Sequence, residues 1–272
     1  MSGIWPGDIR CVAMLTFDLD GQSSWRQRNP DFAHRPSLMS MAEYGPAVAA
    51  PRILELLDSY SIKATFFVPG WVAETHEELV REVYRRGHEI GHHGYMHEPP
   101  AALGSAQEEA QALDRASAAL QRVTGERPRG YRAPGWAPSE HTLSLLSERG
   151  FLYDSSLMGD DVPHFVDAGN GARFVEVPVH WEWDDFPYFA FVPDAGIRGP
   201  MQSPDAVFST WALGFDGVHR WGLAFCLTMH PQIIGRPARL LMLERLVRHM
   251  RAAPDVAFMR CVDVAQMWAD KE

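Results

Sequence analysis

The chain has 272 residues, 46% hydrophobic and 22% charged, which is enough apolar material for the core of an ordinary globular protein. Its formal net charge of −10, without a long run of Lys or Arg, argues against nucleic acid or an anionic membrane as a partner. The N-terminal residues lack a signal-peptide pattern and no apolar run is long enough to span a bilayer, so we expect a cytoplasmic protein.

Segments with the patterns of strands and helices alternate along the whole chain. Strands are expected at residues 11–17, 63–68, 88–92, 129–132, 150–154, 173–179, 223–229 and 256–261. Several are continuous apolar or β-branched runs, which is typical of strands covered on both faces. Helices are expected at about 46–60, 75–87, 105–124, 139–149, 204–215 and 237–253. The helix near 105 opens with Ser105 and Glu108, the pattern of a capping box.

This alternation predicts a parallel sheet, and the seven or eight strands favour a closed or nearly closed barrel in one domain over residues 1–272. Parallel barrels build their sites at the carboxyl ends of the strands. Polar residues that could bind a metal or transfer a proton lie at or just beyond these predicted strand ends: Asp18, Asp20, His93, His97, Arg132, Asp154 and His230. The three cysteines, Cys11, Cys226 and Cys261, lie in apolar runs and are expected to be buried, reduced thiols.

One segment, residues 159–205, interrupts the alternation of predicted strands and helices. It contains little predicted helix and is rich in aromatic and acidic residues. A long irregular stretch in a compact domain is usually functional or an interface. We expect a lid, a substrate wall or an oligomer contact.

Asp18 and Asp20 follow the apolar run 11–15 and are two residues apart. In an extended strand, residues i and i+2 point to the same side, so both carboxylates can face one pocket. A pair of this kind is by itself more often a helix cap or a turn. His93 and His97, four residues apart, can both reach one ion from a helical turn or a tight loop. One Asp and two His would leave a fourth position open and the other Asp free as a base.

Three further residues support a hydrolytic site. Arg132, beside a Pro-Gly turn, is placed to hold Asp18 in a bidentate ion pair, although it could equally cap carbonyl groups. His230 ends a strand and precedes a proline, where it can donate a proton to a leaving amine or be a neutral core residue. Trp136 is either a cleft wall or a packing residue.

Taken together, these motifs resemble the NodB-homology polysaccharide deacetylases (carbohydrate esterase family 4) over nearly the whole chain. The family's Thr-Phe-Asp-Asp-Gly motif corresponds to residues 16–21, and its His-x-x-x-His motif to residues 93–97. Its Arg–Pro turn corresponds to Arg132-Ala133-Pro134, and its Leu-x-x-His-Pro motif to residues 227–231.

The resemblance implies a distorted (β/α)7-type barrel and a divalent metal, usually zinc. It also implies that Asp20, His93 and His97 hold the metal, with Asp18 as the base and His230 as the acid. A homo-oligomer is implied as well. Residues expected to line or support the substrate site are Trp136, Asp154, His92, Asp185 and Tyr188.

Three departures from the family pattern point to one intracellular branch. Leu19 separates the two acids, Glu98 replaces the usual Pro, and no Trp follows Asp154. The branch contains peptidoglycan-deacetylase-like proteins, cyclic imide hydrolases and a metal-free allantoinase type, and the pair of histidines disfavours the metal-free type. Two substrates therefore remain, an amino-sugar glycan and a small cyclic imide or ureide. An inert sugar-binding barrel is the alternative outside the enzymes.

Overall fold

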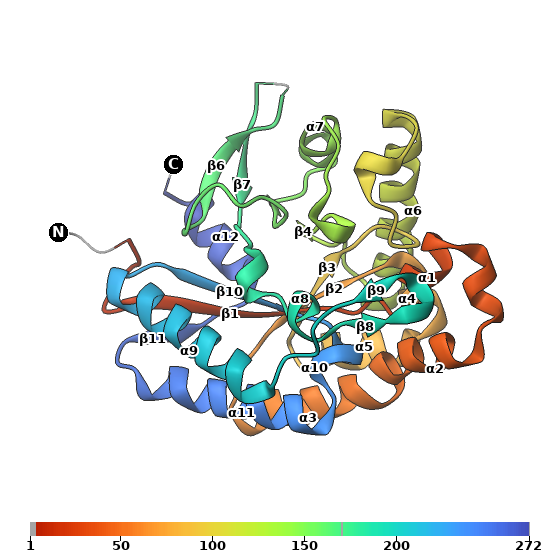
Figure 1. Cartoon of the computed structure of the whole chain (residues 1–272). Coiled ribbons are helices and arrows are strands. Elements are labelled where there is room, and N and C mark those ends of the chain that lie inside the picture. The colour runs from red at the N-terminus through yellow and green to blue at the C-terminus, as the bar shows by residue number, and fades with distance from the viewer. Residues whose placement is uncertain (1–3, 170, 272) are drawn as a thin grey trace.

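The computed structural model describes residues 4–169 and 171–271, and its centre is a curled, mostly parallel sheet (Figure 1). Along the sheet the strands follow the order β10-β1-β2-β3-β4-β5-β7-β6, and β11 pairs with β1. All of these pairs are parallel except that of β6 with β7. The bounds are β1 Cys11–Asp18, β2 Thr65–Val68, β3 Glu89–His92, β4 Gly130–Tyr131, β5 Tyr153–Asp154, β6 His164–Asp167, β7 Arg173–Glu176, β10 Ala224–Met229 and β11 Val256–Phe258. The predicted distorted barrel is confirmed.

Helices cover the outer face of the sheet, and α3, α9 and α11 lie together along one side of it (Figure 1). The longer helices are α2 Pro36–Tyr44, α3 Ala50–Ser59, α5 Glu77–Arg85, α6 Ala106–Thr124, α7 Thr142–Glu148, α9 Pro204–Trp221, α11 Pro237–Ala252 and α12 Cys261–Ala269. The short ones are α1 Ser23–Arg28, α4 Gly70–Thr75, α8 Phe186–Phe189 and α10 Pro231–Ile234. None of the helices in the described ranges is both long and apolar enough to cross a bilayer.

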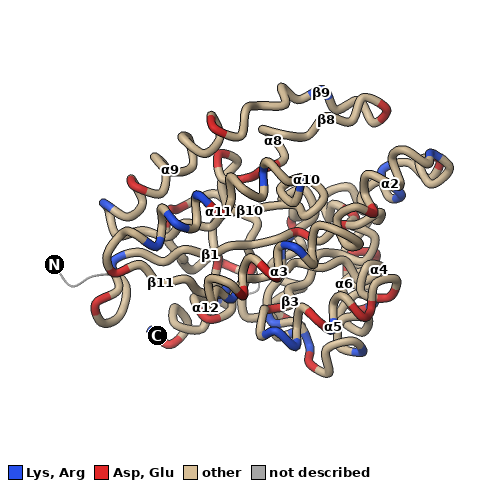
Figure 2. Tube along the Cα trace, turned by 90° about the horizontal axis from the view of Figure 1, so that it is seen from below, with Lys and Arg blue, Asp and Glu red and all other residues tan. Residues whose placement is uncertain are grey.

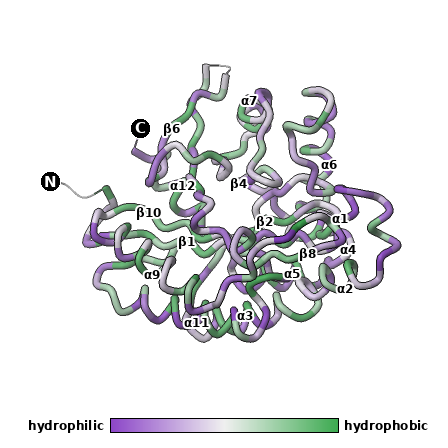
Figure 3. The backbone as a smooth tube through the Cα atoms, in the orientation of Figure 1, coloured by the Kyte–Doolittle hydropathy of each residue, from purple (hydrophilic) through white to green (hydrophobic). Residues whose placement is uncertain are grey.

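In strand β1, alternate residues face the outer helices and the interior of the curled sheet. All eight of its residues are buried. Odd-numbered residues such as Leu15 and Phe17 pack with α3, α9 and α11, whereas Val12 and Met14 join the cluster inside the curl. Because side chains alternate along a strand, Asp18 also points to the inside. Figure 3 shows the hydrophobic course of β1 and β10, and Figure 2 shows charged residues mainly on helices and connections.

Among the described residues, no strand pair joins β10 to β6 at the opposite end of the sheet, so the sheet is not closed in this way. Residues of the 159–205 segment cover the free edge of β10 instead. The Ala224 N–H donates to the Asp161 carbonyl, Asp184 forms an isolated bridge with Thr228, and the Asp185 N–H donates to the Thr228 carbonyl. We call residues 181–185, which include the short 3-10 turn Trp181–Trp183, the seam. It completes the barrel.

Several element predictions are corrected by the structure. The helix expected at 46–60 begins at Pro36, because α2, a π-helical turn at Gly45–Ala49 and α3 are continuous. The helix expected at 75–87 is divided at His76 into α4 and α5. The 159–205 segment contains little helix, as expected, but includes β6 and a hairpin of β8 Phe191–Val192 with β9 Ile197–Arg198. The capping prediction is confirmed, since the Ser105 side chain accepts from the Glu108 N–H. The three cysteines are buried.

Candidate active site

A cavity of about 280 Å³ lies at the carboxyl ends of the strands, and we call it the strand-end cavity. It contains most of the residues singled out in the sequence. Its lining residues are Asp18, Asp20, Ser24, Trp25, Gln27, Arg28, His93, His97, Pro99, Gly135, Trp136, Trp181, Asp184, Phe186, His230 and Gln232.

Asp18 is held in place by a buried arginine. The Arg132 Nη1 donates to Asp18 Oδ1 at 2.8 Å and to the Thr16 hydroxyl at 2.9 Å. The bidentate pair predicted from the sequence is wrong, because Nε and Nη2 donate to the carbonyl and hydroxyl of Ser155. Although burial raises the pKa of Asp18, the charge of Arg132 and the hydrogen bond from it bring that pKa below the usual value, so the carboxylate stays ionised.

Asp20, His93 and His97 form a compact set of metal-type ligand atoms. Asp20 Oδ1 lies 3.6 Å from His93 Nε2 and 3.5 Å from His97 Nε2. Four ligands at about 2.05 Å from a tetrahedral zinc are about 3.3 Å from one another, so these separations match such an ion. Asp20 Oδ1 is also buried without a hydrogen-bond partner. These observations fit a divalent metal.

The protonation of the histidines agrees with this assignment. His93 Nδ1 lies 2.7 Å from the Arg132 carbonyl, to which it can only donate, and this leaves Nε2 free to accept an ion. Burial lowers the pKa of His93 and of His97 to about 4. Burial raises the pKa of Asp20 to about 6.

A tight loop brings the two histidines together, which confirms one of the two geometries expected from their spacing. Gly94 and His97 both have positive φ angles, of 71° and 67°. Glu98 stabilises the turn, since its carboxylate accepts from the N–H groups of Tyr95 and Met96. The acid that replaces the family's proline thus organises the loop.

His230 is held in the cavity by an acidic pair, Asp184 and Asp185. Its Nδ1 lies 2.7 Å from Asp185 Oδ1 and 3.7 Å from Asp184 Oδ1, while Nε2 lies 4.0 Å from Asp20 Oδ2. Its backbone N–H also donates to Asp185 Oδ2. Although burial opposes the charged form, the carboxylates of Asp185 and Asp184 raise the pKa of His230 well above its usual value. His230 is therefore protonated at neutral pH, as a general acid requires.

Aromatic side chains form the mouth of the cavity. Trp136, which has a positive φ of 51°, stacks on Trp181 with ring centroids 4.3 Å apart. Trp25 and Phe186 line it as well. Trp136 therefore lies in the cavity lining, where the sequence placed it as one of two alternatives.

Four of the predicted supporting residues do not line the cavity. His92 points away from it, with Nε2 against the Leu113 carbonyl and Nδ1 accepting from the Gly94 N–H, so it supports the loop. Asp154 is turned toward its neighbour in the register, Glu176, and both have raised pKa values because of burial, Asp154 at about 6. Tyr188 packs on Trp211 and donates to the Glu182 carbonyl. Asp185 does not line the cavity either but supports it through His230.

Among the lining residues that the sequence did not single out as site residues are Trp181, Asp184, Arg28 and Gln232. Asp184 and Trp181 lie in the irregular segment, whose abundance of acids and aromatics was the available signal. Burial raises the pKa of Asp184 to about 7. Arg28 and Gln232 lie in short helices that the sequence did not reveal.

Comparisons with known proteins agree with this geometry. The family model described as polysaccharide deacetylase matches residues 33–153. The peptidoglycan deacetylase of Helicobacter pylori is 32% identical over 255 residues, which cover 85% of this chain and 87% of that protein. The peptidoglycan deacetylase-like protein FGM2 of Gibberella zeae is 28% identical, over 97% of this chain and 88% of its own.

Solved structures of similar proteins also include a member of the polysaccharide deacetylases. A Mycobacterium smegmatis protein assigned to the polysaccharide deacetylases is 39% identical, with a TM-score of 0.94 and coverage of 100% of this chain and 95% of that one. The Puue allantoinase is 25% identical, with a TM-score of 0.85 and coverage of 98% and 93%. The chain belongs to the polysaccharide deacetylase family, whose members are hydrolases of carbon–nitrogen bonds.

Proposed function

We propose that this protein is a metal-dependent deacetylase that hydrolyses the acetamide of an N-acetyl amino sugar in a glycan. The observation that carries the proposal is the close approach of His93 Nε2 and His97 Nε2 to Asp20 Oδ1, which is buried and has no hydrogen-bond partner among the described residues. Asp20, His93 and His97 would hold the ion, and their nitrogen and oxygen donors favour zinc. Because no structural observation bears on assembly, the homo-oligomer stays a prediction.

The proposed ligands, base and acid have separate parts in the reaction. A bound divalent ion would polarise the substrate carbonyl and lower the pKa of a water molecule toward about 7. Asp18, ionised and fixed by Arg132, takes the proton from the attacking water. His230, kept protonated by Asp185, gives a proton to the departing nitrogen.

The first experiment separates metal binding from proton transfer. We expect Asp20→Asn and His97→Gln to lose both bound metal and acetate release from chitooligosaccharide. Asp18→Asn should keep the metal and lose about 10²–10⁴-fold in kcat, because it removes only the base. His141→Gln is the control, since His141 is an exposed histidine outside the cavity. Full turnover by Asp20→Asn under strict chelation would disprove the scheme.

A second candidate function is hydrolysis of a cyclic imide or ureide ring. It is favoured by the likeness to the Puue allantoinase over 98% of this chain. The lining of the cavity by Trp181, Asp184 and Phe186 also suits a small ring. Metal-loaded protein would be given chitooligosaccharide, succinimide and hydantoin, with acetate release and ring opening measured separately. Ring opening without acetate release would replace the first proposal by the second.

A further inference from the structure

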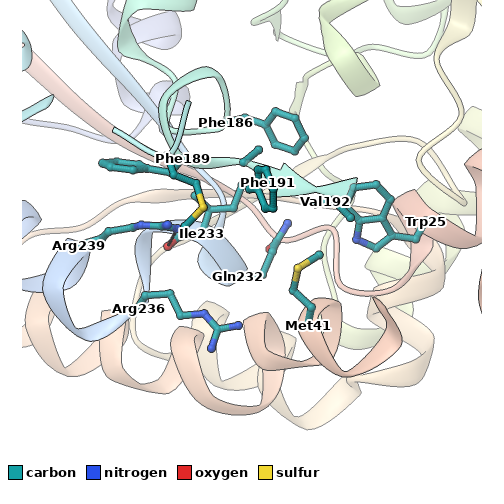
Figure 4. Close-up of a pocket in the computed structure, with 12 residues that line it drawn as sticks. Trp25, Met41, Phe186, Phe189, Phe191, Val192, Gln232, Ile233, Arg236 and Arg239 are labelled. Carbon is teal, nitrogen blue, oxygen red and sulfur yellow. Dashed lines mark hydrogen bonds between the residues drawn. The ribbon is translucent and has the colours of Figure 1, made fainter. Parts of the chain in front are cut away.

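A second cavity, of about 250 Å³, lies beside the strand-end cavity, and we call it the side cavity (Figure 4). Trp25, Phe186 and Gln232 line both cavities, so they form the wall between them. The other walls come from the β8–β9 hairpin, α2, α10 and the start of α11. The chemistry proposed above makes no use of this cavity.

Two polar atoms in the shared wall are buried without a partner. Trp25 is 5% exposed and Gln232 is 7% exposed. The indole Nε1 of Trp25 and the side-chain Oε1 of Gln232 have no hydrogen-bond partner. Figure 4 shows both side chains bordering the cavity, with the Trp25 nitrogen on the side that faces it. Because a buried donor or acceptor is costly to leave unpaired, these atoms indicate a polar occupant.

Two arginines add positive charge to the same cavity. Arg236 and Arg239 line it, and within the described ranges neither forms an ion pair with a carboxylate. Their guanidinium groups lie over aromatic rings, Arg236 at 3.7 Å from the Tyr44 centroid and Arg239 at 4.5 Å from that of Phe189. This stacking fixes both side chains and leaves part of the guanidinium donors of each available. In a chain with a net charge of −10, this is a local site for an anion.

The remaining walls are apolar. Met41, Phe189, Val192 and Ile233 contribute hydrophobic surface, and Phe191 at the rim is 45% exposed. A cavity with aromatic walls and a few convergent polar groups is typical of a site for a small organic molecule.

We propose that the side cavity binds a small organic carboxylate with an apolar body, such as an aryl or arylalkyl acid. The body would lie against Phe189 and Ile233, and the carboxylate would accept hydrogen bonds from the arginines and from Trp25 Nε1. A protonated or hydroxyl group of the ligand, or a water molecule that it orders, would donate to Gln232 Oε1. Guanidinium groups bind carboxylates well because their donors match the two oxygens.

Calorimetric titration of the metal-loaded protein tests the proposal. We expect 3-phenylpropionate to bind with a Kd of about 0.1–1 mM, and its neutral amide at least about tenfold more weakly. The variant Arg236→Gln/Arg239→Gln should lose this preference for the acid. Arg245→Gln is the matched control, since Arg245 is on the same helix but pairs with Asp205. Ile233→Trp, which fills the cavity, should abolish binding.

A carboxylate could also bind a metal in the strand-end cavity, so the location is tested separately. Binding should persist in His97→Gln, and crystals soaked in 4-bromobenzoate should show anomalous bromine signal between Phe189 and Gln232. Bromine only in the strand-end cavity, or at neither place, would overturn the proposal. Equal affinity for the acid and its amide would do so too, as would unchanged binding by the double arginine variant.

Discussion

Arg132 fixes the proposed base through a single nitrogen, and its other donors tie it to Ser155. The side chain is fully buried, and its guanidinium lies 4.1 Å from the Phe67 ring centroid. Contacts with Thr16, Asp18, Ser155 and Phe67 therefore fix the position of the Arg132 side chain. A lysine could keep the charge but could not make these contacts together.

We therefore expect Arg132→Lys to retain its metal and to lose about 10²-fold or more in kcat, because Asp18 would no longer be held in position. Metal content and steady-state kinetics on one preparation provide the check. Arg129→Lys, at an exposed arginine that bonds Gln266, is the control. Loss of metal together with activity would instead assign Arg132 a structural role.

His230 depends on Asp185 for its proton. Replacing Asp185 by Asn removes the largest influence that raises the pKa of His230. A general acid is active only while protonated, so the basic limb of the kcat profile should move to lower pH in Asp185→Asn. The acidic limb, which reports the base, should stay in place. An unchanged basic limb would show that His230 is not the proton donor.

At the scale of elements, helix α9 supports the seam through one glycine. A Cβ at Gly214 would lie 2.9 Å from Trp183 Nε1, whereas a Cβ at Gly217 would meet no atom within 4 Å. Trp183 directly precedes Asp184 and Asp185, which face His230. The close approach of helix and seam therefore affects the acid side of the cavity.

This pair of glycines gives a matched test. Gly217→Ala should stabilise the protein by about 0.5–1 kcal/mol through helix propensity. Gly214→Ala should destabilise it by about 1–3 kcal/mol through overcrowding, and should also lower kcat. Urea denaturation and kinetics on both variants provide the measurement. Equal stabilities for the two would contradict the packing argument.

The elements also show what the sequence could predict. Asp18, Asp20, His93 and His97 were found because each follows a strand with a strong apolar pattern. Asp154 is likewise at a strand end, but the register of β5 with β7 places it against Glu176, and register depends on contacts distant in sequence. Trp181 and Asp184 were missed because tertiary contacts with β10, rather than any periodic pattern, define the seam.

Over the whole molecule, buried neutral histidines contribute to the dependence of stability on pH. Burial lowers the pKa of His88, like that of His92, from 6.5 to about 4. Between these pH values the unfolded chain binds a proton that the folded chain does not. Each group therefore contributes stability that is complete above pH 6.5 and falls as the pH is lowered toward 4.

His88→Asn isolates this effect, because the amide oxygen can replace Nδ1 as acceptor of the Ala64 N–H. Relative to this variant, the wild type should lose about 2 kcal/mol of unfolding free energy between pH 6.5 and pH 4. Urea denaturation across that range measures the difference. Parallel curves for the two proteins would show that His88 does not titrate as its burial requires.

The seam affects how catalytic activity responds to heating. All three proposed metal ligands lie before residue 100, on the loops after β1 and β3, whereas the partners of His230 are on the seam. Opening of the seam along β10 would break the contacts of Asp184 and Asp185 while leaving the ligand set intact. Catalysis should therefore fail some degrees below the main unfolding transition, in protein that still holds its ion.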